Sequence, residues 1–232
     1  MTRDRKSELY YEELREDFAR FMSAYDVDRR VRLIRRLLPP GRPFPRALEV
    51  GCGTGEISRV LVGLAGALTV CDISEALARQ AGERAGCAWA QQDACRLTLP
   101  DGAFDLVVSS ECIEHTPDPR AALSEMARVL APGGLLVVTS PNRLWFPVLH
   151  LAEALGLRKF RGNEIWLFPW QARAVLAERG LAIVASRGCH LFPWQIPGAR
   201  AVLPFFERFD RLLAPAMINF GIAAERPAAR SG

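Results

Sequence analysis

The chain has 232 residues, of which 50% are hydrophobic and 24% are charged, and its formal net charge is +4 at pH 7. A chain of this size and composition can bury one sizeable core, so we predict a single domain over residues 1–232. No uncharged apolar run reaches the ~18 residues that a membrane span needs, and the mixed charges of residues 1–6 are unlike a secretory signal. The modest positive charge gives no reason to expect a nucleic-acid partner.

The cysteines favour a reducing compartment. Six are present, and no two of them form a Cys-x-x-Cys pair. We therefore expect free thiols and a cytoplasmic location. Five of the six lie at or beside expected strands and loops: Cys52, Cys71, Cys87, Cys95 and Cys112.

Residues 1–46 hold the whole net charge, because they contain twelve Lys or Arg residues and eight Asp or Glu residues. Apolar residues at helical spacing predict one helix around Glu8–Ser23 and another around Asp28–Leu38, and Pro39 ends the pattern. We expect residues 1–46 to form a helical cap. The cap either only packs over the sheet or also closes over a bound ligand.

Residues 47–55 read Ala-Leu-Glu-Val-Gly-Cys-Gly-Thr-Gly and predict a buried strand that runs into a glycine turn. Gly51, Gly53 and Gly55 lack Cβ atoms where a ligand must approach the backbone closely. Glu49 lies within the apolar run, where a bare carboxylate is costly unless a polar or cationic group meets it. An acidic strand end followed by this loop suits a cationic adenosyl ligand better than a phosphate.

The next predicted strand, Leu68–Asp72, ends in a carboxylate 21 positions after Gly51. An acid about 20 residues beyond a glycine loop is placed to accept hydrogen bonds from ribose hydroxyls. A nicotinamide-dependent enzyme would show the same feature. The alternative role for Asp72 is a helix cap, but Ser74 is better placed to cap the helix that begins near Glu75.

Three more strands are expected before residue 142. The strand Ala88–Gln92 leads to Asp93, the strand within 102–110 leads to Glu111, and the strand Leu135–Thr139 is nearly all apolar. A helix capped by Asp118 lies between the last two. Alternating strands and helices predict a doubly wound parallel sheet whose ligand lies beyond the carboxyl ends of the strands.

The remaining sequence contains two apolar, irregular segments, 143–170 and 188–213. A helix at about Pro169–Arg179 and a sixth strand at Leu181–Ser186 separate them, and a last strand is expected near Asn219–Ala224. The apolar excess either packs these segments onto the domain or forms a lid over a hydrophobic substrate.

Residues 47–142 resemble the class I S-adenosylmethionine-dependent methyltransferases, on the glycine motif and the strand-end acids. The resemblance implies S-adenosylmethionine as cofactor and a Rossmann-like sheet of seven strands, whose last strand is antiparallel and lies between strands five and six. In the family, the acid at the position of Asp93 reads the adenine amino group. The cofactor-binding residues that it implies are Glu49, Gly51, Cys52, Gly53, Gly55, Asp72, Ile73, Asp93, Ala94, Ser110 and Glu111. Tyr25 and either Arg29 or Arg30 are expected to reach the methionine carboxylate.

A sulfonium methyl group is already electrophilic, so catalysis requires positioning and, for a hydroxyl acceptor, removal of its proton. His115 is the predicted general base, because it is the only one of the three histidines at an expected strand end facing the predicted pocket and because imidazole titrates near neutral pH. The alternative role is a wall residue hydrogen-bonded to a loop. The pattern Glu111-x-x-Glu114-His115 is similar to the ubiquinone-biosynthesis O-methyltransferases, in which the corresponding residues are linked to a divalent cation. Glu111, Glu114 and His115 are therefore a candidate metal site, unless Glu114 only pairs with a neighbour.

The expected acceptor is a small molecule, hydrophobic, aromatic or lipid-like, that is methylated at oxygen, and brief peripheral contact with a membrane is a further expectation for the apolar lid. The alternatives are a nucleic-acid or protein methyltransferase and a non-catalytic S-adenosylmethionine-binding or regulatory homologue. Residues 109–112 read Ser-Ser-Glu-Cys rather than the Asn/Asp-Pro-Pro-aromatic motif of base-amine methyltransferases, which argues against a nucleic-acid enzyme. A non-catalytic binding homologue shares the fold, but the intact glycines and strand-end acids favour cofactor binding. The sequence predicts no oligomeric state.

Overall fold

The computed structural model describes residues 24–154 and 164–228. The predicted helix around Glu8–Ser23 lies outside these residues, as do positions 155–163 of the first apolar segment. The division of the chain into cap, core and lid therefore stays a prediction.

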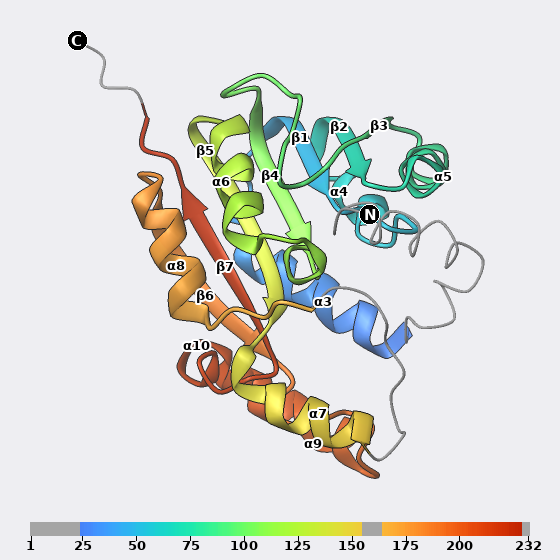
Figure 1. Ribbon diagram of the computed structural model, residues 1–232, viewed down its shortest axis with the longest axis vertical. Helices are drawn as coiled ribbons and strands as arrows, with labels where there is room; N and C mark the ends of the chain where they lie inside the picture. The colour runs from blue at the N-terminus through green and yellow to red at the C-terminus, as the bar shows by residue number, and fades with distance from the viewer. Residues whose placement is uncertain (1–23, 155–163, 229–232) are drawn as a thin grey trace.

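The described residues form a seven-stranded sheet with the order β3-β2-β1-β4-β5-β7-β6 (Figure 1). β1 to β5 pair in parallel, whereas β7 is antiparallel to both β5 and β6. The predicted Rossmann-like sheet, with its antiparallel last strand between strands five and six, is confirmed. The strands are β1 (Phe44–Val50), β2 (Ala65–Asp72), β3 (Ala88–Gln91), β4 (Phe104–Ser110), β5 (Leu130–Pro141), β6 (Ala182–Cys189) and β7 (Asn219–Glu225).

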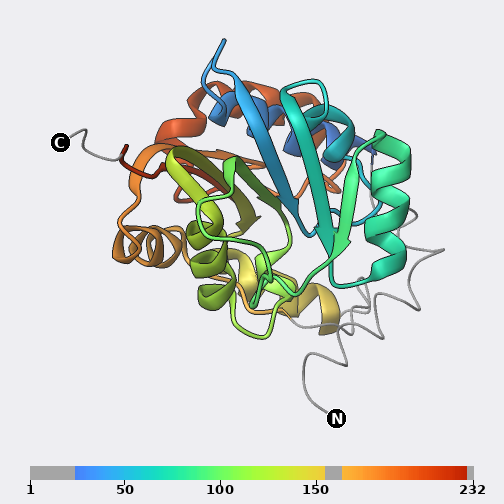
Figure 2. The same ribbon diagram turned by 90° about the horizontal axis from the view of Figure 1, so that it is seen from above.

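Helices cover both faces of the sheet (Figure 2). α3 (Ala24–Leu37), α4 (Ser58–Leu61) and α5 (Glu75–Ala85) pack on one face, and α6 (Pro119–Val129) and α8 (Pro169–Glu178) pack on the other. Along β5, Leu135 and Val137 belong to the hydrophobic core beneath α3, α4 and α5, while Leu136 and Val138 belong to the core beneath α6 and α8. A strand buried on both faces must be apolar at every position, which explains the unbroken run in the sequence.

The helix starts follow the predicted caps. The Ser74 hydroxyl accepts a hydrogen bond from Leu77 N at the start of α5. The Asp118 carboxylate accepts from Arg120 N and Ala121 N at the start of α6. These bonds satisfy amides that have no partner within the helix. Because Ser74 is the cap of α5, Asp72 is available for another role.

Strand β5 is longer than predicted. It begins at Leu130 rather than Leu135, so it also includes Pro132, Gly133 and Gly134, which precede the predicted strand. Gly133 has a φ of +73°, and its amide donates to Arg226 O. The glycine therefore allows the chain to continue along β7 instead of leaving the sheet.

Strand β6 is also longer, since it ends at Cys189 rather than Ser186. Its added residues pair with the start of β7, where Gly188 opposes Phe220. A Cβ atom on Gly188 would lie 2.7 Å from the Met217 sulfur, so only glycine permits this close approach. As a result, His190 directly follows the end of β6. The sequence had placed only His115, of the three histidines, at a strand end.

The two apolar segments form short helices at one end of the molecule (Figure 1): η2 (Arg143–Trp145), α7 (Phe146–Ala154), α9 (Ala199–Phe206), η3 (Glu207–Phe209) and α10 (Asp210–Leu213). Part of their apolar surface is buried, as at Leu203 and Trp166, and part is exposed. The exposed large apolar side chains of the two segments are Leu144, Val148, Leu151, Trp170, Ile196, Val202, Phe205, Phe209 and Leu212. Within the described ranges, no helix is both long and apolar enough to cross a membrane.

Candidate functional site

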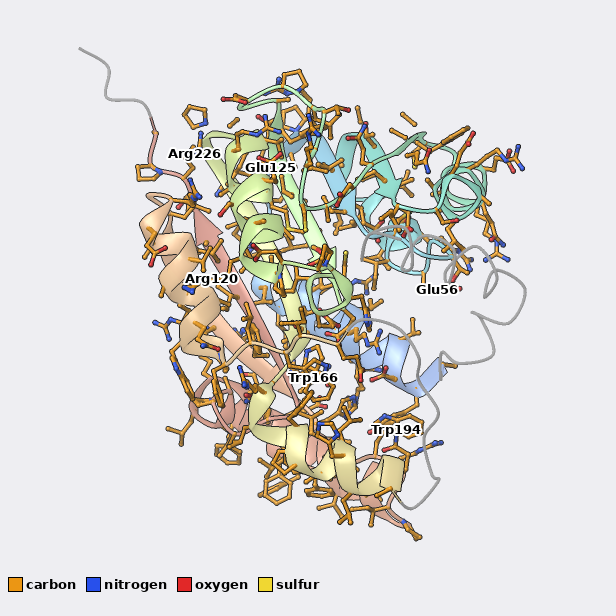
Figure 3. All side chains as sticks on the ribbon, in the orientation of Figure 1. Glu56, Arg120, Glu125, Trp166, Trp194 and Arg226 are labelled. Carbon is orange, nitrogen blue, oxygen red and sulfur yellow. The ribbon has the colours of Figure 1, made fainter. Side chains whose placement is uncertain are left out.

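A hollow of about 480 Å³, partly open to solvent, lies beyond the carboxyl ends of β1 and β4. It has the position expected for a ligand of a doubly wound sheet. Six predicted cofactor-binding residues line it: Glu49, Gly51, Cys52, Gly53, Ser110 and Glu111. The other lining residues are Val27 and Arg30 from α3, and Thr54, Glu56 and Ile57 after the glycine loop; Glu56 is labelled in Figure 3.

The glycine loop is shaped by close packing. Gly51 has a φ of +75°, and a Cβ atom there would lie 2.2 Å from the Cys112 sulfur. Gly55 has a φ of +85°, and its missing Cβ makes room for Ala81 of α5 at 3.0 Å. Gly51 therefore lets the loop lie against the end of β4, while Gly55 serves the packing of α5 and does not line the hollow.

Asp72 joins the end of β2 to this loop. Its Oδ2 accepts a hydrogen bond from Gly53 N at 2.9 Å, and its Oδ1 accepts from Ser74 N at 3.1 Å. The carboxylate is 9% exposed. The strand-end position is as predicted, and in the structure Asp72 also fixes the conformation of the glycine loop.

Glu49 is met by a polar group, as its burial requires. Its Oε2 accepts from the Ser58 hydroxyl at 2.5 Å, and the side chain is 2% exposed. Burial, together with the nearby charge of Asp72, raises the pKa of Glu49 to about 8. The carboxyl is thus largely protonated at neutral pH without a ligand, which corrects the assumption of a fixed negative charge at this strand end.

Glu111 lies at the end of β4 with an unusual positive φ of 52°. Its Oε1 accepts from the Thr139 hydroxyl at 3.1 Å, and its Oε2 accepts from Asn219 Nδ2 at 2.7 Å. Burial raises the pKa of Glu111 to about 7, and the positive charge of Arg30 opposes that rise. A carboxyl that titrates near neutral pH therefore lines the hollow opposite a guanidinium.

The predicted metal ligands are not arranged around a common point. Glu111 faces Thr139 and Asn219, whereas Glu114 Oε2 accepts from the Ser140 hydroxyl at 2.9 Å. His115 Nε2 lies 3.8 Å from Glu114 Oε1. Across residues 24–154 and 164–228, no group of three His, Cys, Asp or Glu side chains is disposed to hold a metal ion. These carboxylates are engaged by hydroxyl and amide donors, which do not fit a divalent cation.

His115 lies in η1 (Ile113–His115), and its side chain is 26% exposed. It is not among the residues that line the hollow. The backbone around it is tied to the segment after residue 163, because Ile165 N donates to Glu114 O at 2.8 Å. His115 therefore lies outside the lining of the hollow, and its role as the general base stays a prediction.

The remaining predicted cofactor residues lie beside the hollow, outside its lining. Asp93 follows β3, and its Oδ1 accepts from Cys95 N at 2.8 Å, which shapes the turn after the strand. Ala94 is 8% exposed, and Ile73 follows Asp72 at the end of β2. The adenine role of Asp93 and Ala94 stays a prediction.

The structure distinguishes the two cap arginines. Arg29 is 7% exposed and pairs with Glu207 Oε2 at 3.1 Å, whereas Arg30 lines the hollow and pairs with Asp26. Among the described residues, the buried Arg30 Nε has no hydrogen-bond partner. A buried donor without a partner is costly, so Arg30 fits an anionic group in the hollow, such as a ligand carboxylate.

Sequence reasoning missed several residues that support the site. Asn219 at the start of β7 holds Glu111, and Ser58 at the start of α4 holds Glu49. Ser58 lies nine residues after Glu49, and a hydroxyl shortly after the glycine loop could have been predicted from sequence as the partner of this carboxyl. Asn219 lies 108 residues after Glu111, and only the sheet topology brings them together.

Residues 48–138 match the family model described as a methyltransferase domain. The malonyl-[acyl-carrier protein] O-methyltransferase of Paenibacillus sp. (strain JDR-2) is 31% identical over 155 residues, which are 60% of this chain and 56% of that protein. The ubiquinone biosynthesis O-methyltransferase of Xanthomonas axonopodis pv. citri (strain 306) is 34% identical over 174 residues, which are 69% of this chain and 71% of that protein.

A solved S-adenosylmethionine-dependent methyltransferase from Thermotoga maritima has 18% sequence identity and a TM-score of 0.70, over 93% of this chain and 98% of that one. This likeness shows a shared fold. The chain spans only 34–56% of the length of the first curated relatives that it matches. The sequence similarity, with the antiparallel β7 between β5 and β6, shows that the chain belongs to the class I S-adenosylmethionine-dependent methyltransferases.

Proposed function

We propose that the protein transfers a methyl group from S-adenosylmethionine to an oxygen atom of a small, hydrophobic acceptor. The observation that carries the proposal is the hollow itself, which is lined both by the close-packed Gly51 loop and by Arg30, whose Nε has no hydrogen-bond partner in the described part of the chain. A cofactor with a sulfonium, an ammonium and a carboxylate matches a site that offers both acidic and basic side chains.

Each end of the cofactor has a partner in this assignment. Arg30 binds the methionine carboxylate as a charge-assisted pair. Glu49 and Glu111 face the cationic part, and their pKa values of about 8 and about 7 fall when a cation arrives. Asp72 accepts from the ribose hydroxyls, and Asp93 reads the adenine amino group. Bound in this way, S-adenosylmethionine supplies an electrophilic methyl carbon, and the protein has to orient the acceptor.

Two features support the choice of acceptor. Both curated relatives described above are named O-methyltransferases, which favours oxygen as the methylated atom. The segments 143–170 and 188–213 supply apolar side chains, among them Trp166, which is 8% exposed and meets the Phe146 ring edge-on with 5.5 Å between centroids. Walls of this kind exclude water and suit an acyl, prenyl or aromatic group.

The acceptor can be sought with methyl-labelled S-adenosylmethionine and a total small-molecule extract of the source cells. We expect label in a product that partitions into organic solvent, together with stoichiometric S-adenosylhomocysteine. Cofactor binding without any labelled product would indicate a binding or regulatory homologue. Label found only in added nucleic acid or protein would indicate a macromolecular acceptor.

The same assay tests two expectations from the sequence, namely His115 as the base and a divalent cation held by Glu111, Glu114 and His115. If His115 is the base, His115→Ala should lower turnover by ~10²–10⁴ and leave cofactor affinity nearly unchanged. If a divalent cation is required, a chelator should abolish turnover and Mg²⁺ should restore it. An active His115→Ala variant together with a chelator-insensitive enzyme would exclude both, and catalysis would then depend on positioning alone or on a base within residues 143–213.

A further inference from the structure

A second polar cluster lies beside the cofactor hollow, between α3 and the end of β6. At its centre is His190, which directly follows β6, is 1% exposed and has a φ of +58°. Its Nε2 lies 3.2 Å from Asp26 Oδ1, and the other oxygen of Asp26 pairs with Arg30. Since Arg30 lines the hollow, the imidazole is two contacts away from the cofactor site.

A second chain of contacts leads from the hollow to the same histidine. Glu111 lines the hollow and accepts from the Asn219 amide at 2.7 Å. Asn219 pairs with Cys189 across the β6–β7 ladder, and His190 O accepts from Ile218 N at 2.8 Å. His190 is therefore held rigidly by backbone and lies on the side of the hollow that Arg30 and Glu111 form.

Four buried polar atoms of this cluster have no hydrogen-bond partner in the part of the chain that the structure describes: His190 Nδ1, Tyr25 Oη, Arg29 Nε and Arg29 Nη2. The three residues lie together, because the Tyr25 ring centroid is 5.8 Å from the imidazole and 5.5 Å from Arg29 Cζ. A buried polar group that is left unpaired destabilises the folded protein. Several in one place indicate a site built for a polar ligand group.

The partner of Nε2 decides which histidine nitrogen is the base. Burial raises the pKa of Asp26, but its hydrogen bond to His190 and the charge of Arg30 outweigh burial and hold that pKa below its ordinary value. An ionised carboxylate can only accept, so His190 Nε2 must donate to it. In the neutral imidazole, Nδ1 then carries the lone pair. A base oriented by a carboxylate in this way is the arrangement used for proton removal in many transferases and hydrolases.

The other charges of the cluster favour an acceptor whose oxygen becomes negative. Two nitrogens of Arg29, Nε and Nη2, have no hydrogen-bond partner within residues 24–154 and 164–228, while Glu207 holds the third at 3.1 Å. Arg200 lies over the Tyr25 ring at 5.1 Å and over the Trp194 ring at 4.7 Å. Trp194 is labelled in Figure 3 near the start of α3. The site thus combines one lone-pair base with hydroxyl and guanidinium donors.

We propose that His190 is the general base of the methyl transfer, and that Tyr25 and Arg29 bind the acceptor oxygen. This inference rests on the proposed function. A bond forms between the acceptor oxygen and the methyl carbon while the bond between that carbon and the sulfonium sulfur breaks, and sulfur keeps the electron pair. The acceptor's proton passes to His190 Nδ1, and the resulting imidazolium is stabilised by Asp26. The acceptor class is a hydroxyl compound.

The first test needs no acceptor. Imidazole ¹⁵N spectra of the full chain saturated with S-adenosylhomocysteine at pH 8.5 report which ring nitrogen carries the proton. The three histidines are assigned with His115→Gln and His150→Gln. We expect the His190 proton on Nε2 and none on Nδ1. A proton on Nδ1 would overturn the assignment of the base, whatever the turnover.

The second test measures label transfer into the small-molecule extract. His190→Gln should lower transfer by ~10²–10⁴ and leave S-adenosylhomocysteine affinity within about threefold, whereas His150→Gln, at an exposed position on α7, should transfer at the wild-type rate. Equal rates for His190→Gln and the wild type would overturn the proposal. A wild-type protein that labels nothing counts against the proposed function, and the spectra still decide the state of Nδ1.

Tyr25→Phe tests the acceptor site with a variant that should keep the fold intact. The Tyr25 hydroxyl has no hydrogen-bond partner among the described residues, so its removal should not lower the melting temperature. If it binds the acceptor oxygen, transfer should fall about tenfold or more, as expected for the loss of a hydrogen bond to charge that develops in the transition state. An unchanged rate would remove Tyr25 from the site and contradict the acceptor position proposed here.

Discussion

Asp72 holds the glycine loop directly, because its Oδ2 accepts a hydrogen bond from Gly53 N at 2.9 Å. The same carboxylate reaches Ser74 N through its other oxygen. One side chain at the end of β2 therefore sets the conformation of the loop at the end of β1. In the proposed complex it also binds the ribose, so the geometry of the loop and the recognition of the ligand depend on one residue.

Asp72→Ala should weaken S-adenosylhomocysteine binding by about 2–3 kcal/mol, or roughly 30- to 150-fold, because charge-assisted hydrogen bonds are lost. Titration calorimetry measures the change. Asp72→Asn is the matched control, since its amide oxygen can still accept from one backbone amide and should lose less affinity. An unchanged dissociation constant for Asp72→Ala would place this residue outside the site.

Gly51→Ala should abolish detectable cofactor binding and destabilise the fold. The new Cβ would lie 2.2 Å from the Cys112 sulfur, and the φ of +75° adds strain. Gly133→Ala isolates the strain, because Gly133 has nearly the same φ of +73° and nothing within 4 Å of the added atom. That control should cost only about 1 kcal/mol of unfolding free energy and leave binding intact. Equal losses in both variants would contradict a close approach at Gly51.

The ligand-free protein should become less stable as the pH rises from about 4.5 to 8. Glu49 has its pKa raised from 4.5 to about 8, so the folded state binds a proton that the unfolded state releases in this window. The stabilisation is complete below pH 4.5 and is lost as the pH passes 8. Glu111 and Glu114, with pKa values of about 7, act in the same direction.

Thermal unfolding between pH 5 and 8.5 tests this expectation. Glu49→Gln keeps a neutral, hydrogen-bonding side chain and should flatten the pH dependence. Asp105 and Glu125 have lowered pKa values, so their contribution has the opposite sign and falls below about pH 4.5, outside the window. A wild-type melting temperature that rises steadily with pH would contradict a protonated Glu49.

The strand-end chemistry could be predicted from sequence because it depends on local order. Glu49, Gly51 and Gly53 line the hollow as the motif predicted, since a strand followed by glycines fixes the direction in which these residues point. Contacts across distant elements could not be predicted. Asn219 reaches Glu111 only because β7 is inserted beside β5, and no local pattern encodes that pairing.

The histidines show the same limit. The sequence favours His115 because the predicted sixth strand ends at Ser186, so that His190 falls in the irregular segment 188–213. In the structure β6 continues to Cys189, because Gly188 permits close packing on Met217. With three additional residues in β6, His190 also follows a strand end, and we propose it as the base in place of His115 in η1. A difference of three residues in the end of one strand therefore changes which histidine is the candidate general base.

The exposed apolar residues near α9 and α10 should bind an anionic membrane surface. Phe205, Phe209 and Leu212 are 55%, 47% and 77% exposed, and the exposed Arg208 and Arg211 lie among them. Such a combination favours the interface of acidic lipids. Leu212→Asp should reduce co-sedimentation with phosphatidylglycerol vesicles, whereas Val184→Asp, at a site 53% exposed on β6, should not. Wild-type protein that stays in the supernatant would exclude the membrane contact.

Calorimetry of the wild-type protein with S-adenosylhomocysteine and with NAD tests the central claim most directly. We predict one S-adenosylhomocysteine per chain, competition with S-adenosylmethionine, and loss of binding in Gly51→Ala. NAD should not bind, because its pyrophosphate would lie beside Glu49, whose carboxyl offers a phosphate no positive partner and repels it once ionised. Tight NAD binding, with no heat from S-adenosylhomocysteine, would contradict the assignment of this hollow as a methyl-donor site.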